Sequence, residues 1–234
     1  MIAMQRVKTG VPGLDELLEG GFPSASAILL VGPPGVGKST FCQQFIMEGL
    51  LEDQPAIYIT LDISPEEAKQ SLERMGLQKE KEDDIRFVDA YSWRYGKSEA
   101  KYSVGNLGNI NEFNIAISEA MQNIGNSPVK RKALDSISTL LLYADPKLVV
   151  KLIPIIIAKA RKAGYVLVLI VEEGVHDPQT VATLNYATDG LIEFKMEGDS
   201  RMLRISKMKA TKVLRNWNEY EITEKGLTLK KEVS

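Results

Sequence analysis

The feature that most constrains this chain is an octapeptide near its N-terminus. It reads Gly32-Pro33-Pro34-Gly35-Val36-Gly37-Lys38-Ser39 and matches the pattern G-x-x-x-x-G-K-[ST] in full. An apolar run over residues 27–31 precedes it and predicts a buried strand, and residues 37–51 predict a helix. A turn of this kind binds phosphate, because its backbone N–H groups point at the phosphate oxygens. The sequence therefore predicts a nucleotide-phosphate site at the start of this helix.

Each residue type in the loop has an expected role. Gly35 and Gly37 allow the backbone to fold into a turn of amides, and Lys38 is expected to contact the β- and γ-phosphates. The hydroxyl of Ser39 is expected to bind magnesium, and Thr40 lies within reach of the α-phosphate. The predicted cofactors are ATP and Mg²⁺. The predicted nucleotide-binding residues of the loop are Pro34, Gly35, Val36, Gly37, Lys38, Ser39 and Thr40.

Strand-length apolar runs alternate with helical patterns along the rest of the chain, which is typical of parallel βαβ units. Residues 190–229 alternate in the manner of antiparallel strands, and residues 94–108 have no clear period and predict a long loop. We predict one α/β domain over residues 1–234, with a mostly parallel twisted sheet, flanking helices and antiparallel strands at its C-terminal edge. Further strands are predicted at residues 56–61, 85–88, 132–136 and 165–171, and helices at 64–76, 111–124 and from 145.

Composition narrows the classes of function. The formal net charge is -2, so any contact with DNA or RNA must come from a local basic patch. The sequence has no apolar run near 20 residues and no signal peptide, so we expect no membrane span. The single cysteine, Cys42, is expected to be a small buried residue, and a cytoplasmic location fits a chain that cannot form an internal disulfide.

A magnesium ion beside a phosphate loop needs a carboxylate at the end of a neighbouring strand to hold its waters. Asp135 is the best candidate, because it lies near the end of the short strand predicted over residues 132–136. Its alternative role is to cap a helix that begins at Ile137. The predicted metal residues are therefore Ser39 and Asp135.

Other segments resemble a known family. Residues 9–23 read TGVPGLDELLEGGFP and resemble the start of the KaiC/RadA branch of RecA-like ATPases. Asp135-Ser136 looks like the magnesium-site Asp-Ser of that family, Lys207-Met208-Lys209 like its Lys-x-Arg finger, and residues 222–226 like its closing Ile-Thr-x-x-Gly. The resemblance covers nearly the whole chain as one KaiC-type domain, without the N-terminal DNA-binding domain of the RadA recombinases.

This resemblance implies a homo-oligomer, either a hexamer or a filament, with ATP at the subunit interfaces. In such an assembly Lys207 and Lys209 would reach the γ-phosphate bound by the neighbouring subunit. The family's water-orienting carboxylate ends the strand after the phosphate-loop helix, which here is Asp62. The predicted catalytic residues are therefore Asp62 and Lys38, although Asp62 has the alternative role of a solvated residue leading into the next helix.

Two departures from the family pattern concern catalysis. The family usually carries Glu-Glu where this chain has Asp62-Ile63, and its finger ends in arginine where this chain has Lys209. Aspartate is one methylene shorter than glutamate, and lysine cannot form the planar bidentate contact of arginine. Both changes predict that nucleotide binding is kept and that hydrolysis is slow or lost.

Three further features have alternative interpretations. A basic cluster within fifteen residues could face phosphate at a subunit interface, contact a DNA backbone, or be the solvated face of a hairpin. Aromatic residues interleaved with basic ones in residues 91–102 could stack single-stranded bases, but a lid packed on the domain is favoured. The basic cluster comprises Arg201, Arg204, Lys207, Lys209, Lys212 and Arg215, and the aromatic segment comprises Tyr91, Trp93, Arg94, Tyr95, Lys97, Lys101 and Tyr102.

The third feature is residues 172–177, which follow a central strand and so line the ligand crevice. The resemblance implies that this region senses the γ-phosphate and leads into a mobile loop. His176, the only histidine, is expected to be polar surface rather than a metal ligand.

Three functions remain open. The first is a nucleotide-gated regulatory or signalling module, in which ATP sets the assembly state and a protein partner reads it. The second is an accessory factor in DNA recombination that resembles the archaeal paralogs of RadA, binds single-stranded DNA and has a DNA-stimulated ATPase. The third is an ATPase motor subunit. The net charge and the missing DNA-binding domain favour the first over the second, and residues 62, 63 and 209 argue against the third.

Overall fold

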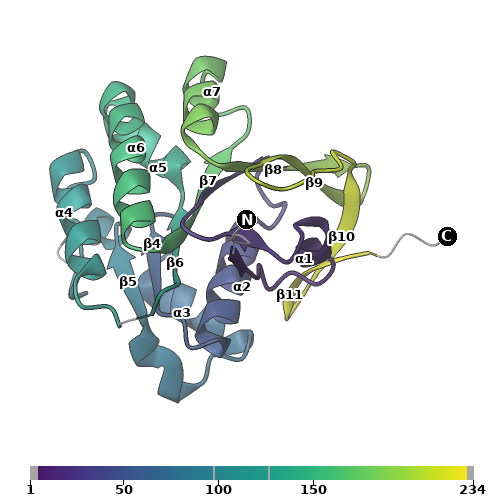
Figure 1. Cartoon of the computed structure of the whole chain (residues 1–234). Helices are drawn as coiled ribbons and strands as arrows, with labels where there is room; N and C mark the ends of the chain where they lie inside the picture. The colour runs from purple at the N-terminus through teal and green to yellow at the C-terminus, as the bar shows by residue number, and fades with distance from the viewer. Residues whose placement is uncertain (1–4, 97, 126, 231–234) are drawn as a thin grey trace.

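The computed structural model describes residues 5–96, 98–125 and 127–230, and a nine-stranded sheet forms its centre (Figure 1). The strand order is β11-β10-β9-β8-β3-β7-β6-β4-β5. Neighbours from β5 to β8 are parallel, and those from β8 to β11 are antiparallel. The strands are β3 (Ala27–Gly32), β4 (Ala56–Thr60), β5 (Ile85–Asp89), β6 (Lys130–Asp135), β7 (Tyr165–Glu172), β8 (Gly190–Glu197), β9 (Ser200–Met208), β10 (Asn218–Thr223) and β11 (Gly226–Leu229).

This arrangement confirms the predicted α/β architecture with an antiparallel C-terminal edge. One detail differs, because β8 was predicted to be antiparallel throughout and instead pairs in parallel with β3 on one side. The carboxyl end of the sheet is defined here as the end where β3, β4, β6 and β7 finish, and the amino end as the end where they begin.

Helices cover both faces of the sheet (Figure 1). Side chains of α1, α2 and α3 pack on one face, and those of α4, α5, α6 and α7 on the other. No helix in the described ranges is long and apolar enough to cross a membrane. The remaining elements are a short sheet of β1 (Arg6–Val7) and β2 (Phe22–Pro23), the helices α1 (Leu14–Leu17), α2 (Lys38–Leu51), α3 (Pro65–Arg74), α4 (Ile110–Met121), α5 (Ile137–Tyr143), α6 (Pro146–Lys162) and α7 (Pro178–Ala187), and the 3-10 helices η1 (Lys79–Asp84) and η2 (Ser92–Tyr95).

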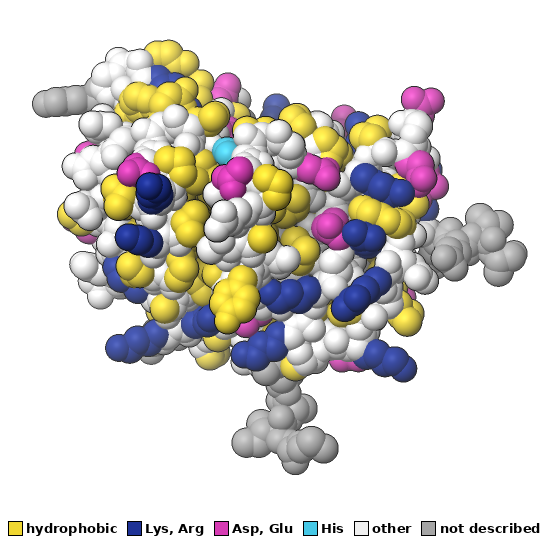
Figure 2. Space-filling view, turned by 90° about the horizontal axis from the view of Figure 1, so that it is seen from above, with side chains coloured by type: hydrophobic (Ala, Val, Ile, Leu, Met, Phe, Trp, Pro, Cys, Tyr) yellow, Lys and Arg dark blue, Asp and Glu magenta, His cyan; other side chains and the backbone are white. Residues whose placement is uncertain are grey.

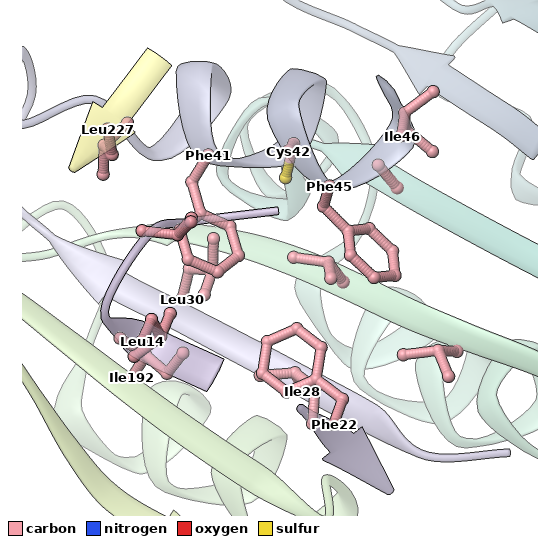
Figure 3. Close-up of a cluster of buried hydrophobic side chains, with 14 of the residues drawn as sticks. Leu14, Phe22, Ile28, Leu30, Phe41, Cys42, Phe45, Ile46, Ile192 and Leu227 are labelled. Carbon is pink, nitrogen blue, oxygen red and sulfur yellow. The ribbon is translucent and has the colours of Figure 1, made fainter. Parts of the chain in front are cut away.

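The core under α2 fixes the helix that begins at the phosphate loop. Figure 3 shows Phe41 and Phe45 of α2 directed at β3 and at Phe22. The rings of Phe22 and Phe45 meet edge to face with centroids 5.8 Å apart. Burying an aromatic side chain of this size stabilises the fold by about 1.5 to 3 kcal/mol. Cys42 is buried beside them, as predicted, and burial raises the pKa of its thiol well above the usual value.

Strand β6 begins two residues earlier than predicted, because Arg131 and Lys132 are fully buried strand residues. Arg131 is tolerated there because its guanidinium donates to the carbonyl of Phe45 at 2.8 Å and pairs with Glu52 at 3.3 Å. Helix α7 was not predicted, and it follows residues 172–177, which the family resemblance implied lead into a mobile loop.

The segment around residues 91–102 packs on the domain as a lid, the favoured interpretation. The ring of Trp93 meets Tyr143 of α5 with centroids 5.0 Å apart. Arg94 stacks on both rings and donates to the carbonyl of Leu61 at 3.1 Å. Lys97, one of the basic residues of this segment, lies outside the described residues.

Candidate functional site

The phosphate loop has the backbone geometry that the sequence predicts. Gly35 and Gly37 have φ of 80° and 94°, in the left-handed region where a side chain is strained. A Cβ on Gly37 would also lie 2.5 Å from a methyl group of Ile222, whereas no atom lies within 4 Å of a Cβ built on Gly35. Helix α2 begins at Lys38, so its first N–H groups face the loop. Open space above Gly35 and the start of a helix together suit a bound anion.

Lys38 lies at the centre of the site. Its side chain is buried, and Nζ donates to the carbonyls of Gly32 at 2.8 Å and Pro33 at 2.7 Å. The third contact is an ion pair with Glu172 Oε2 at 2.8 Å. Since an ammonium group has three donors, the protein uses all of them.

Asp135 ends β6 at the same end of the sheet and is buried. It accepts a hydrogen bond from Tyr58 Oη at 2.7 Å. Burial raises the pKa of the Asp135 carboxyl to about 6, and the charges of Asp62 and Glu172 act in the same direction, while Tyr58 and Ser39 hold it down. Ser39 and Asp135, the two predicted metal residues, are therefore side by side.

The alternative role of Asp135 as a helix cap is wrong. The N-cap of α5 is Ser136, whose Oγ accepts from the N–H of Thr139 at 3.3 Å. The Asp135 carboxylate thus remains directed at Tyr58 and Ser39.

Asp62 lies two residues beyond the end of β4 and is exposed. Its carboxylate accepts a hydrogen bond from the hydroxyl of Thr139. Asp62 is therefore near Asp135 at the carboxyl end of the sheet, but its carboxylate is already hydrogen-bonded to the Thr139 side chain. The next residue, Ile63, packs against the core and offers no carboxylate.

Glu172 is a site residue to which sequence reasoning assigned no specific contact. Glu172 is the last residue of β7. Because β7 lies beside β3, Glu172 pairs in register with Gly32, the first residue of the phosphate loop. The N–H of Glu172 is held by Ser138 Oγ at 2.8 Å. The available signal was its position directly after the apolar run of β7, at the end of a central strand.

A cavity of about 420 Å³ adjoins the phosphate loop on the side of α3 and the C-terminal hairpin. Its size and its position next to Thr40 suit the nucleoside part of a nucleotide. Sequence reasoning missed Ser71 and Arg74 here, because α3 carries no motif that marks them. The lining residues are Thr40, Gln43, Ser71, Arg74, Met75, Ile222, Thr223 and Glu224.

The C-terminal hairpin holds the loop in place. Tyr220 of β10 donates from its hydroxyl to the carbonyl of Val36. Gln44 of α2 donates to the carbonyl of Leu227 at 3.0 Å and accepts from its N–H at 2.7 Å. The closing segment noted in the sequence therefore packs directly on the helix that carries the phosphate loop.

The structure does not bring Lys207 and Lys209 to the phosphate loop of their own chain. Met208, between them, pairs with Gly190, which pairs with Ile28 near the start of β3. The phosphate loop follows the other end of β3. At the rise per residue of a β-strand, this end lies roughly 13 Å from Ile28. Lys209 is exposed and lies 3.8 Å from Asp189.

The basic cluster is not one unpaired surface. Arg204 pairs with Glu193 at 2.7 Å, and its guanidinium lies 4.5 Å from the ring centroid of Trp217. On the face shown in Figure 2, basic side chains are interspersed with acidic and hydrophobic ones. Across residues 5–96, 98–125 and 127–230, no group of three or more His, Cys, Asp or Glu side chains is arranged to hold a metal ion.

Comparisons with known proteins agree with this geometry. A family model described as the KaiC ATPase matches residues 7–234. The UPF0273 protein PF1931 of Pyrococcus furiosus is 32% identical over 237 residues, covering 96% of this chain and 93% of the relative. The UPF0273 protein MK0039 of Methanopyrus kandleri is 31% identical and covers 97% and 92%. The crystal structure of the KaiC-like protein PH0186 from Pyrococcus horikoshii has a TM-score of 0.79 at 26% identity, with 97% of this chain and 100% of that chain covered.

Proposed function

The chain belongs to the KaiC family of ATPases, and on that premise we propose that it binds ATP with Mg²⁺ and uses the nucleotide as a signal. Bound ATP would set the assembly state of the protein, and hydrolysis would be slow or absent. The observation that carries the proposal is the cluster of Lys38, Ser39 and Asp135 beside the amide turn of the phosphate loop.

The residues present fit the nucleotide and the metal. The amides at the start of α2 and the Lys38 ammonium would hold the phosphates, with the nucleoside in the cavity next to Thr40. The Ser39 hydroxyl would bind magnesium directly, and Asp135 would hold its waters. Magnesium at this position neutralises charge on the phosphate oxygens.

Slow hydrolysis is supported by the contacts of the two altered positions. Thr139 holds the Asp62 carboxylate, which is already one methylene shorter than the usual glutamate. Lys209 lies near Asp189 of its own chain and lacks the bidentate fork of arginine. An arginine finger accelerates phosphoryl transfer by about 10³ to 10⁵ where it has been measured.

The proposal includes a homo-oligomer formed by one domain over residues 1–234. Lys207 and Lys209 lie at the amino end of the sheet, so they could approach a phosphate only in a neighbouring copy. The recombination alternative has less support, because Arg204 and Lys207 are engaged within the chain rather than presented to DNA.

The test is to measure ATP binding and steady-state ATP hydrolysis with magnesium, each with and without single-stranded DNA. We expect binding with little turnover and no stimulation by DNA. Turnover at the rate of family members that keep Glu-Glu and the arginine would refute the signalling proposal. Stimulation by DNA would favour the recombination factor instead.

A further inference from the structure

One buried lysine that the nucleotide site does not use lies on the other face of the sheet from α2. Lys132 of β6 is fully buried under α4 and α6, which lie side by side over that face (Figure 1). In the described part of the chain, its Nζ contacts Met121 Sδ at 2.8 Å and lies 4.5 Å from the ring centroid of Tyr165, and neither contact is an oxygen acceptor. A thioether sulfur is a weak acceptor, so this ammonium group is poorly satisfied for a buried charge.

The neighbouring lysine of α6 shows what Lys132 lacks. Lys159 Nζ donates to Asn114 Oδ1 and to Ser118 Oγ, each at 3.1 Å, and both oxygens belong to α4. Met121 lies about one turn beyond Ser118 on the same helix, so α4 offers oxygen to one lysine and sulfur to the other. Burial and the charge of Lys159 together lower the pKa of Lys132 to about 7. An oxygen atom at Met121 would supply the missing acceptor.

Met121 is placed where such an oxygen can be added. Its side chain is only partly buried at the margin of the core, whereas Met47 and Met208 are buried. In the reaction with hydrogen peroxide, the sulfur lone pair takes one oxygen, the O–O bond breaks, and the second oxygen leaves with both protons as water. Sulfur is oxidised by two electrons and peroxide is reduced by the same two. The product, methionine sulfoxide, carries a polar oxygen on the atom that Lys132 already contacts.

We propose that Met121 is a reversible oxidation site whose sulfoxide is stabilised by Lys132. A sulfoxide at the margin of a core ordinarily destabilises a fold, because it introduces a polar group without a partner. Here the new oxygen would accept a hydrogen bond from Lys132 Nζ, so oxidation satisfies a buried donor that the reduced protein leaves poorly paired. Sulfoxide reductases restore the thioether, which makes the change reversible. This site goes beyond the proposed function and does not depend on nucleotide.

The hydrogen bond has a defined effect on the titration of Lys132. Stabilising its charged form raises its pKa from about 7 toward the unfolded value of 10.5. The pH window in which the unfolded chain binds more protons then becomes narrower. Oxidation is therefore expected to raise stability at pH 7 and to weaken the increase of stability with pH.

The test combines oxidation by hydrogen peroxide with a direct titration of Lys132. Peptide mass spectrometry locates the sulfoxides, and NMR of isotope-labelled lysine gives the pKa of Lys132 before and after oxidation. Met121→Leu removes the sulfur, and Met196→Leu is its matched control at a 44% exposed position of β8. We expect oxidation to raise the pKa of Lys132 by at least about one, a tenfold change in proton affinity, in the parent chain and in Met196→Leu but not in Met121→Leu.

Thermal unfolding at pH 7 gives a second readout that uses Lys132→Leu. Because other methionines also oxidise, each change in Tm is taken relative to Met121→Leu treated in the same way. Oxidation of Met121 is expected to raise the Tm of the parent chain and to lower the Tm of a chain that carries Lys132→Leu, in which no ammonium group receives the oxygen.

Three results would overturn the proposal. The first is a Met121 that stays reduced under conditions that oxidise Met196. The second is a pKa of Lys132 that is unchanged or lower after oxidation of Met121. The third is an equal loss of stability in the parent chain and in Lys132→Leu. None of these results bears on nucleotide binding, so the proposed function is tested separately.

Discussion

The two ends of the sheet hold charged side chains in different ways. At the carboxyl end, Asp135 and Glu172 are the last residues of β6 and β7, Lys38 begins α2 after the phosphate loop, and these side chains contact or influence one another. Toward the amino end, Arg131 and Lys132 lie inside β6 and face opposite layers of the core. Charges at strand ends can exchange a protein partner for a ligand, whereas charges inside a strand must be satisfied by the protein or lose their proton.

The two buried basic residues of β6 show both outcomes. Arg131 donates to the carbonyls of Lys8 and Phe45 and pairs with Glu52. For Lys132, the described contacts are Met121 Sδ at 2.8 Å and the ring of Tyr165 at 4.5 Å. Burial, together with the charge of Lys159, lowers the pKa of Lys132 to about 7.

The largest expected effect is at the carboxyl end. Lys38→Ala removes the only charged donor of the phosphate loop, and charge-assisted hydrogen bonds of this kind contribute about 1.5 to 3 kcal/mol each. We expect ATP affinity to fall by about 100-fold or more, measured by calorimetry. Lys162→Ala, at an exposed position of α6, is the matched control and should bind normally. Equal affinity in the two variants would remove Lys38 from the site.

Restoring the family residues should produce the next largest effect. Asp62→Glu combined with Lys209→Arg is expected to raise ATP turnover by at least about tenfold, because it supplies a longer carboxylate and a bidentate finger. Each single variant should give less than the pair. If the pair hydrolyses ATP no faster than the parent chain, these two positions do not explain slow turnover.

Asp135 makes magnesium-dependent ATP binding sensitive to pH. Its pKa of about 6 means that it is ionised at pH 7 and neutral at pH 5, and a neutral carboxyl cannot stabilise a cation. We expect the magnesium-dependent gain in affinity to fall by about tenfold per unit below pH 6. Asp135→Asn should lose most of the gain at pH 7 and show little further change. An equal pH dependence in parent and variant would contradict this assignment.

The smallest effect concerns Lys132. Its folded pKa of about 7 lies below the unfolded value of 10.5, so the unfolded chain binds more protons between these values. Its contribution to stability therefore rises with pH across that window and is unfavourable below it. Lys132→Met should raise the free energy of unfolding at pH 7, measured by chemical denaturation, by about 1 kcal/mol, and it should flatten the dependence of stability on pH.

Arg131→Met should instead lower the free energy of unfolding by about 2 kcal/mol, because it removes satisfied hydrogen bonds.

Sequence reasoning succeeded where the signal is local. The phosphate loop and the end of β6 each combine a short motif with the strand that positions it, so Ser39 and Asp135 could be placed together. The Lys38–Glu172 contact was missed because it joins residues far apart in sequence and depends on β7 lying beside β3. The early start of β6 was missed because hydropathy disfavours Arg131 and Lys132, whereas tertiary contacts permit their burial. Helix α7 was missed because only Leu184 gives it a buried face.

The most direct test of the central claim is a single-turnover measurement. ATP labelled at the γ-phosphate is mixed with excess protein and Mg²⁺, and free phosphate and bound ATP are followed together. We expect most of the ATP to stay bound and intact for many minutes, because Asp62 and Lys209 do not assemble an efficient hydrolytic site. Release of phosphate within seconds, at the rate at which ATP binds, would contradict it.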